Sequence, residues 1–290
     1  MFMRSHFLLT SALAVGSLGS MGCSLSATPD APDAADPISS TATAVVVVER
    51  TTGPGDAVRA DAVIARFVRV RQGVVDEQAL RLAGAAWDLP AVGTCSSSSP
   101  PPAAGRASAA VDLLDVGVLT LGDREVAGSA RSTVLLPRTM FDPTGGVSGV
   151  FYSGRSAEAF TPAARLQLHT SGGPDLPEGF VVNVASPREV TEVRVRFSSN
   201  LEVTWEASES DDARDLVYVD VLAGTKPGAR LVARCTTLDV GQLIVPSTSL
   251  GAIEEGQLSV HRLHRESFRT KGIEPGEVRF DVARVVTFHR

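Results

Sequence analysis

The sequence predicts a mainly β protein, built from antiparallel β-sandwich domains that follow an exported N-terminus. From residue 43 onward the chain consists of short apolar or alternating runs bounded by Gly, Pro, Asp and Ser, which is the pattern of strands and turns. Hydrophobic residues make up 43% of the 290 residues, so the chain can bury a sizeable core and is not disordered throughout. The formal net charge of −6 disfavours a general affinity for nucleic acid, which requires basic patches.

The first twenty-three residues predict export and lipidation. An apolar run covers residues 7–18, too short to span a bilayer but of the size of a signal-peptide core, and no charged residue lies between His6 and Cys23. The sequence Ser20-Met21-Gly22-Cys23 resembles the bacterial lipobox, although Ser20 stands where that pattern prefers leucine. The resemblance implies a signal peptide over 1–22 and acyl chains of the palmitate class on Cys23. The alternative is an ordinary secretory signal that leaves Cys23 as a thiol.

The expected lipid anchor places the protein at a membrane surface. Two or three acyl chains hold a protein stably at a membrane, whereas one chain binds marginally. In similar lipoproteins an aspartate after the cysteine causes retention at the inner membrane, so Ser24 favours the outer membrane. Residues 23–41 are rich in Pro, Ala, Asp and Ser, and we expect them to form a disordered, acylated tether.

The body is expected to contain two β domains, over 42–186 and 187–290, with a boundary near Ser186-Pro187. The strands expected in the first domain are 44–50, 62–70, 111–121, 131–136, 149–152, 165–169 and 180–184. One short helix is expected over 76–86, because Asp76 is a typical N-cap and Leu80, Ala83 and Trp87 follow at helical spacing. The strands expected in the second domain are 191–197, 201–206, 216–222, 230–236, 242–245, 257–264 and 277–289.

Seven strands in about 100 residues is the number expected of an immunoglobulin-like sandwich. The run 200–205, Asn-Leu-Glu-Val-Thr-Trp, resembles the tryptophan-bearing strand of fibronectin type III and related domains. Alternation favours Trp205 as a core residue over a ligand-stacking platform. The resemblance implies an immunoglobulin-like C-terminal fold, similar to that of uncharacterised lipoproteins from GC-rich Gram-negative bacteria. It implies no activity, because this fold carries many functions.

Two further patterns each leave two interpretations. With Cys23 acylated, Cys95 and Cys235 remain as an even pair, and a disulfide that closes so long a loop is expected to add about 4–5 kcal/mol of stability. The alternative is two unrelated thiols. The sequence Leu-Asp-Val-Gly occurs at 114–117 and again at 238–241, which indicates either a duplicated β unit or a turn whose glycine has positive φ.

No sequence motif predicts catalysis or a metal site. His261 and His264 lie three apart on an expected strand, so they should face opposite sides, and we expect the histidines to be exposed to solvent. The run 146–150 lacks the second glycine of a nucleophile elbow, and there is no Ser-x-x-Lys. Asp211, Asp212 and Asp215 form a weak calcium candidate, for which a solvated acidic loop is the favoured interpretation.

These observations predict a non-enzymatic surface or periplasmic lipoprotein that acts in adhesion, as a scaffold or as a binding module. Its expected partners are the membrane, through the anchor, and an envelope protein or glycan, and no cofactor is expected. The first alternative is carbohydrate or peptidoglycan binding, for which Tyr152 is a candidate stacking residue although aromatic residues make up only 5% of the chain. A hydrolase with a dispersed site is a third hypothesis.

Overall fold

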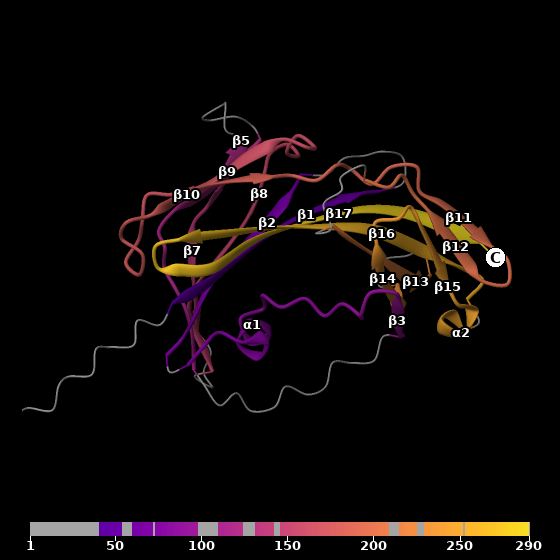
Figure 1. Ribbon diagram of the computed structural model, residues 1–290, viewed down its shortest axis with the longest axis horizontal. Helices are drawn as coiled ribbons and strands as arrows, with labels where there is room; N and C mark the ends of the chain where they lie inside the picture. The colour runs from indigo at the N-terminus through magenta and orange to yellow at the C-terminus, as the bar shows by residue number, and fades with distance from the viewer. Residues whose placement is uncertain are drawn as a thin grey trace, which may run out of the picture. The chain divides into compact units, whose positions relative to one another are not determined.

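β-strands make up most of the chain, which confirms the predicted mainly β class (Figure 1). The computed structural model describes residues 41–53, 60–71, 73–97, 110–123, 131–141, 146–208, 215–224, 229–251 and 253–289. The predicted signal peptide, Cys23 and the tether up to residue 40 lie outside the described residues. Their predicted properties therefore stay predictions.

The largest sheet has ten strands in the order β3-β14-β13-β16-β17-β1-β2-β4-β8-β7. Its neighbours are mostly antiparallel, but β1 pairs with β17, and β4 with β8, in parallel. The expectation of purely antiparallel sheets was therefore wrong for this sheet, which is mixed. The strands are β1 (Ala42–Thr52), β2 (Ala62–Val70), β3 (Thr94–Ser97), β4 (Val111–Leu113), β7 (Pro137–Phe141), β8 (Val147–Arg155), β13 (Leu216–Ala223), β14 (Arg230–Leu238), β16 (Glu255–Thr270) and β17 (Ile273–His289).

Two small antiparallel sheets complete the described fold. One has the order β10-β9-β5-β6 and the other β11-β12-β15. Their strands are β5 (Leu119–Asp123), β6 (Ser132–Leu135), β9 (Arg165–Thr170), β10 (Phe180–Ala185), β11 (Arg194–Phe197), β12 (Leu201–Thr204) and β15 (Gln242–Val245).

Both small sheets pack against the same face of the large sheet. Side chains alternate along a strand, so Val46 and Val48 of β1 face the same side as Val260 of β16 in the observed register. The β1 valines belong to a buried core shared with β5, β9 and β10, and Val260 to a second core shared with β12 and β15. Trp205 is buried in the second core, which confirms its predicted place.

The other face of the large sheet is covered in part by helix α1 (Glu77–Leu82), which Figure 1 shows on the opposite side from β5 and β9. The helix begins as predicted: Asp76 is the N-cap, and its Oδ1 accepts a hydrogen bond of 2.8 Å from the Ala79 amide. Ala79 and Ala83 pack with β2 and β4 in a third core. A second short helix, α2 (Ser247–Leu250), was not predicted, so the expectation of one helix was wrong.

The strand predicted over 111–121 is divided into β4 and β5 by a turn. Gly117 has φ of +81°, and its amide donates 2.9 Å to the carboxylate of Asp115. Gly241, at the equivalent place in the repeated sequence, has φ of +77°. Glycine reaches this backbone region at little cost, so both copies have the property that the turn interpretation of the repeat requires.

The hairpin β16–β17 joins strands from both sides of the expected domain boundary. β16 has 16 residues and β17 has 17, and they pair along nearly their whole length. On one side β17 binds β1, from the expected first domain, and on the other β16 binds β13, from the expected second domain. The division at residues 186 and 187 stays a prediction.

Candidate functional site

Two buried arginines rise side by side from the face of the large sheet that carries the small sheets. Arg50 of β1 and Arg262 of β16 both lie opposite Val282 of β17 in the strand register. Their side chains are only 6% and 1% exposed. Burial of a guanidinium costs free energy unless the group is paired with a counter-charge or hydrogen-bond acceptors. The fold must therefore keep the partners of both arginines in place.

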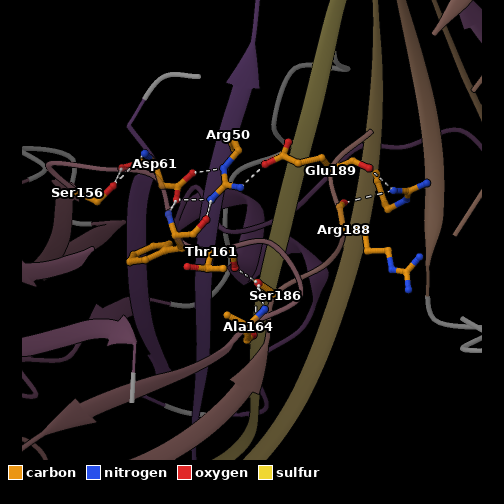
Figure 2. A network of polar contacts seen from close by, with 10 residues as sticks. Arg50, Asp61, Ser156, Thr161, Ala164, Ser186, Arg188 and Glu189 are labelled. Atoms are coloured by element: carbon orange, nitrogen blue, oxygen red, sulfur yellow. Dashed lines mark hydrogen bonds and ion pairs between the residues drawn. The ribbon is translucent and has the colours of Figure 1, made fainter. Parts of the chain in front are cut away.

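Arg50 lies at the centre of the polar network in Figure 2. Its Nε and Nη2 each donate 2.7 Å to a carboxylate oxygen of Asp61, and its Nη1 binds Glu189. Nη2 also donates to the carbonyl of Phe160, whose amide donates 2.5 Å back to Asp61. Burial alone would lower the pKa of Arg50, but the hydrogen bonds and charges of Asp61 and Glu189 outweigh burial and raise it, so the guanidinium stays charged.

Arg262 holds the second half of the network. Its Nε donates 2.8 Å to Asp239, and its Nη1 donates 2.7 Å to the carbonyl of Glu189. The same aspartate accepts a hydrogen bond of 2.7 Å from the indole Nε1 of Trp205. Asp239 is the aspartate of the second Leu-Asp-Val-Gly copy. The turn at 238–241 therefore also positions two buried side chains, those of Trp205 and Arg262.

The segment between β10 and β11 is therefore fastened to the large sheet by both arginines. Ser186 adds local contacts: its amide donates 2.9 Å to the carbonyl of Ala164, and its hydroxyl donates 2.9 Å to the carbonyl of Thr161 (Figure 2). Residues 156–164 and 186–191 thus have fixed positions beside β1.

A pocket of about 370 Å³ opens beside this network. Small-molecule sites usually measure about 300–1,000 Å³, so a compact ligand fits this volume. Apolar groups line part of the pocket, including Phe160 and Val190, and arginine and threonine side chains supply polar groups. The lining residues are Arg50, Thr52, Arg131, Ala159, Phe160, Thr161, Pro162, Glu189, Val190, Thr191 and Arg284.

One polar group in the pocket lining has no partner among the described residues. Thr52 is buried, and its Oγ1 makes no hydrogen bond within the described structure. A buried hydroxyl without a hydrogen bond costs about 1–3 kcal/mol. Because Oγ1 is shielded from solvent, a ligand recovers this energy only when the Thr52 side chain turns toward the pocket. The pocket therefore combines an unsatisfied hydroxyl with arginines at its wall.

Cys95 and Cys235, which the sequence suggested as a pair, form a disulfide. They lie directly opposite each other on the antiparallel strands β3 and β14, with Cα atoms 4.0 Å apart. Cys235 is fully buried in the second core. The bond fixes the edge strand β3 to the sheet.

The expectation that the histidines are exposed was wrong for His264 and His261. His264 is buried and its Nδ1 bonds the carboxylate of Asp215, which is also buried. Burial alone would lower the pKa of His264, but its contacts with Asp215 and Glu266 prevail and raise it. His261 is half-buried, and both of its ring nitrogens have partners.

The weak calcium candidate is only partly described. Asp211 and Asp212 lie outside the described residues, whereas Asp215 is committed to His264 rather than exposed in a solvated loop. Within the described ranges, no group of three or more His, Cys, Asp or Glu side chains is placed to hold a metal ion.

Tyr152, the candidate for stacking on a sugar, is fully buried. Its hydroxyl accepts a hydrogen bond of 2.8 Å from the Val116 amide and donates 3.2 Å to Asp115. Trp205 and Tyr218 are buried as well, and Trp87 is half-buried against the ring of Tyr218. Tyr152 therefore serves the core and presents no face to a ligand.

In the part of the chain that the structure describes, no helix has the length and apolar character needed to cross a bilayer. No protein-family model matches this sequence, and no curated protein matches it either.

Proposed function

We propose that this chain is a cell-envelope lipoprotein, anchored through acyl chains on Cys23, whose β body acts as a binding or scaffold module. The observation that carries the proposal is the apolar run of residues 7–18 followed by the lipobox-like Ser20–Cys23. The disulfide between Cys95 and Cys235 is in keeping with an oxidising compartment outside the cytoplasm. Ser24 after the cysteine favours the outer membrane over the inner membrane.

We further propose that residues 187–290 are an immunoglobulin-like sandwich. Four strands, β14-β13-β16-β17, face the three strands β11-β12-β15 across the core that contains Trp205. That count and the buried tryptophan on β12's continuation support the likeness. The fold itself implies no ligand.

The pocket beside Arg50 is the proposed recognition site of the module. Its threonine hydroxyls and arginines suit a ligand with hydroxyl and carboxylate groups, and its apolar wall suits a ring. A carboxylated sugar, as found in peptidoglycan, has all three features. This chemistry favours the glycan-binding version of the proposed module, through hydrogen bonds rather than aromatic stacking.

The anchor is tested by replacing Cys23 with alanine. In detergent phase separation of whole-cell extracts, the native protein is expected in the detergent phase, and the Cys23→Ala protein in the aqueous phase, because the acyl chains are lost. Ser24→Ala, which keeps the acylated cysteine, should still partition with detergent. A mature native protein that remains aqueous and carries an unmodified sulfhydryl at its first residue would refute the anchor.

The recognition site is tested by Thr52→Val, which removes only the hydroxyl whose Oγ1 has no partner within the described structure. Titration with N-acetylmuramic acid and soluble muropeptides should show a three- to ten-fold loss of affinity, the value of about one hydrogen bond. The free energy of unfolding should not fall and is expected to rise, since the variant loses a buried hydroxyl that makes no hydrogen bond.

Thr133→Val is the matched control. Thr133 is also buried and its Oγ1 is likewise unpartnered among the described atoms, but it lies on β6 and does not line the pocket. Its affinity should equal that of the native protein. Equal affinities for the native protein and Thr52→Val, or no binding of these probes, would remove the pocket from the proposal.

A further inference from the structure

A second polar cluster lies on the face of the large sheet opposite to the one that carries Arg50 and Arg262. No sequence motif indicated this cluster. Ser259 and His261 are two residues apart on β16, so they face the same side. Asp281 of β17 lies opposite Leu263, which puts it diagonally next to His261 on that side. The three side chains therefore come together without any contiguous sequence pattern.

The hydrogen bonds join these groups in one order. The Nδ1 of His261 is 2.8 Å from Oδ1 of Asp281, and its Nε2 is 2.9 Å from Oγ of Ser259. A carboxylate only accepts hydrogen bonds, so a neutral His261 donates from Nδ1 to Asp281 and accepts from the serine hydroxyl at Nε2. This is the arrangement of nucleophile, base and orienting carboxylate that defines a serine triad.

Tyr218 fixes the histidine and the aspartate from the neighbouring strand. Its hydroxyl donates 2.6 Å to Oδ2 of Asp281, and its ring stacks on that of His261 with centroids 4.2 Å apart. Burial, with the nearby charge of Asp281, raises the pKa of the Tyr218 hydroxyl, which therefore remains a protonated donor. Both carboxylate oxygens of Asp281 are thus engaged, and the imidazole has one orientation.

An ion pair lies beside the serine, on the neighbouring strands β13 and β14. Asp220 is directly opposite Ser259 in the register, and Arg234 is opposite Asp220, which it binds at 2.7 and 2.6 Å. The Arg234 guanidinium also lies 5.0 Å from the centroid of the Tyr218 ring. Asp220, the residue next to Ser259, is an anion whose charge Arg234 offsets, so an oxyanion formed at Ser259 would lie beside a balanced ion pair rather than a free positive charge.

We propose that Ser259, His261 and Asp281 form an acyl-transfer site that cleaves small esters. The Ser259 Oγ forms a bond to the ester carbonyl carbon while its proton passes to His261 Nε2, and Asp281 stabilises the resulting imidazolium. The bond to the leaving alkoxide then breaks, and the alkoxide takes that proton. Water, deprotonated by the same nitrogen, hydrolyses the acyl-serine, so that one ester and one water yield one acid and one alcohol.

The exposure of the cluster limits the substrate. Ser259 is 7% exposed and the His261 side chain 16%, so only a small part of the cluster is accessible to solvent. The indole of Trp87, which packs edge-on against Tyr218 at 6.2 Å, adds an apolar surface nearby. Short acyl chains such as acetate fit these conditions better than long ones. The proposal goes beyond the binding module and does not depend on the pocket beside Arg50.

The test uses the detergent-solubilised full chain with two probes. A fluorophosphonate, which forms a covalent bond with activated serines, should label the native protein, and peptide mass mapping should place the label on Ser259. Release of 4-nitrophenol from 4-nitrophenyl acetate should fall at least about 100-fold in Ser259→Ala and Asp281→Asn. Ser267→Ala, an exposed serine on the same strand, should keep the native rate.

Each other outcome decides against the triad. No label on the native protein, or a label mapped to another serine, refutes it without any variant. An unchanged ester cleavage rate in a folded Ser259→Ala protein refutes it as well. Asp281→Asn could disturb folding, since that carboxylate is buried. In that case the peptide mapping of the native protein still tests the triad.

Discussion

Removal of the disulfide is expected to lower the free energy of unfolding by about 5 kcal/mol in the chain-entropy model, the largest effect we expect from any small change. Cys95 and Cys235 are separated by 140 residues, so the bond removes much of the freedom of the unfolded chain. The double variant Cys95→Ala, Cys235→Ala tests this without adding a buried polar group. Urea unfolding followed by tryptophan fluorescence gives the difference directly.

A reductant supplies the control for this experiment. Reduction should lower the stability of the native protein toward that of the double variant, and should leave the double variant unchanged. Intact mass should rise by two hydrogens on reduction of the native protein only. Equal urea midpoints for the native and double-variant proteins would contradict the expectation.

Replacement of Arg50 by methionine should cost about 3–5 kcal/mol of unfolding free energy, because it leaves a buried carboxylate without its cation. Asp61 is fully buried, and its bidentate contact with Arg50 is one of the bonds that fix the loop at Phe160. The loss should appear as a lower urea midpoint. The pocket should also lose its shape, since Arg50 forms part of its wall.

Two control variants separate the effect of burial from that of an ion pair as such. Arg71→Met breaks a similar two-pronged contact with Asp112, but the Arg71 side chain is 61% exposed, and the cost should stay below about 1 kcal/mol. Asp61→Asn added to Arg50→Met removes the stranded charge and should restore part of the stability. If Arg50→Met cost no more than Arg71→Met, the buried network would not be an important source of stability.

Local patterns in the sequence predicted most strands, but not which strands pair with one another. Alternating apolar residues and turn residues located the strands on both sides of the hairpin β16–β17, and an N-cap aspartate located the start of α1. β3 was missed because it is a Ser-rich edge strand tied by Cys95, and β7 because it begins with Pro137, which edge strands tolerate. Pairing of β1 with β17 joins residues at opposite ends of the chain, and no local pattern encodes such a contact.

The sites were harder to predict than the strands. Arg50 lies near the end of the valine-rich strand β1, where a charged residue indicates a buried ion pair but does not identify the partner. Arg262 lies in β16 among other charged and polar residues, so its burial had no such signal. Ser259 and His261 at a spacing of two could have been recognised as neighbours on one strand face. Asp281 could not, because its place beside them depends on the register between β16 and β17.

The parallel pairing of β1 with β17 determines when the large sheet can form as the chain is made. β1 starts at Ala42, but its neighbour on one side is Ile273–His289, the last strand described. Synthesis proceeds from the N-terminus, so β1 is made long before β17, and one of its edges stays uncovered until β17 follows. Until then β1 has an open, valine-rich edge, and an unpaired strand edge of this kind favours pairing with other chains and aggregation.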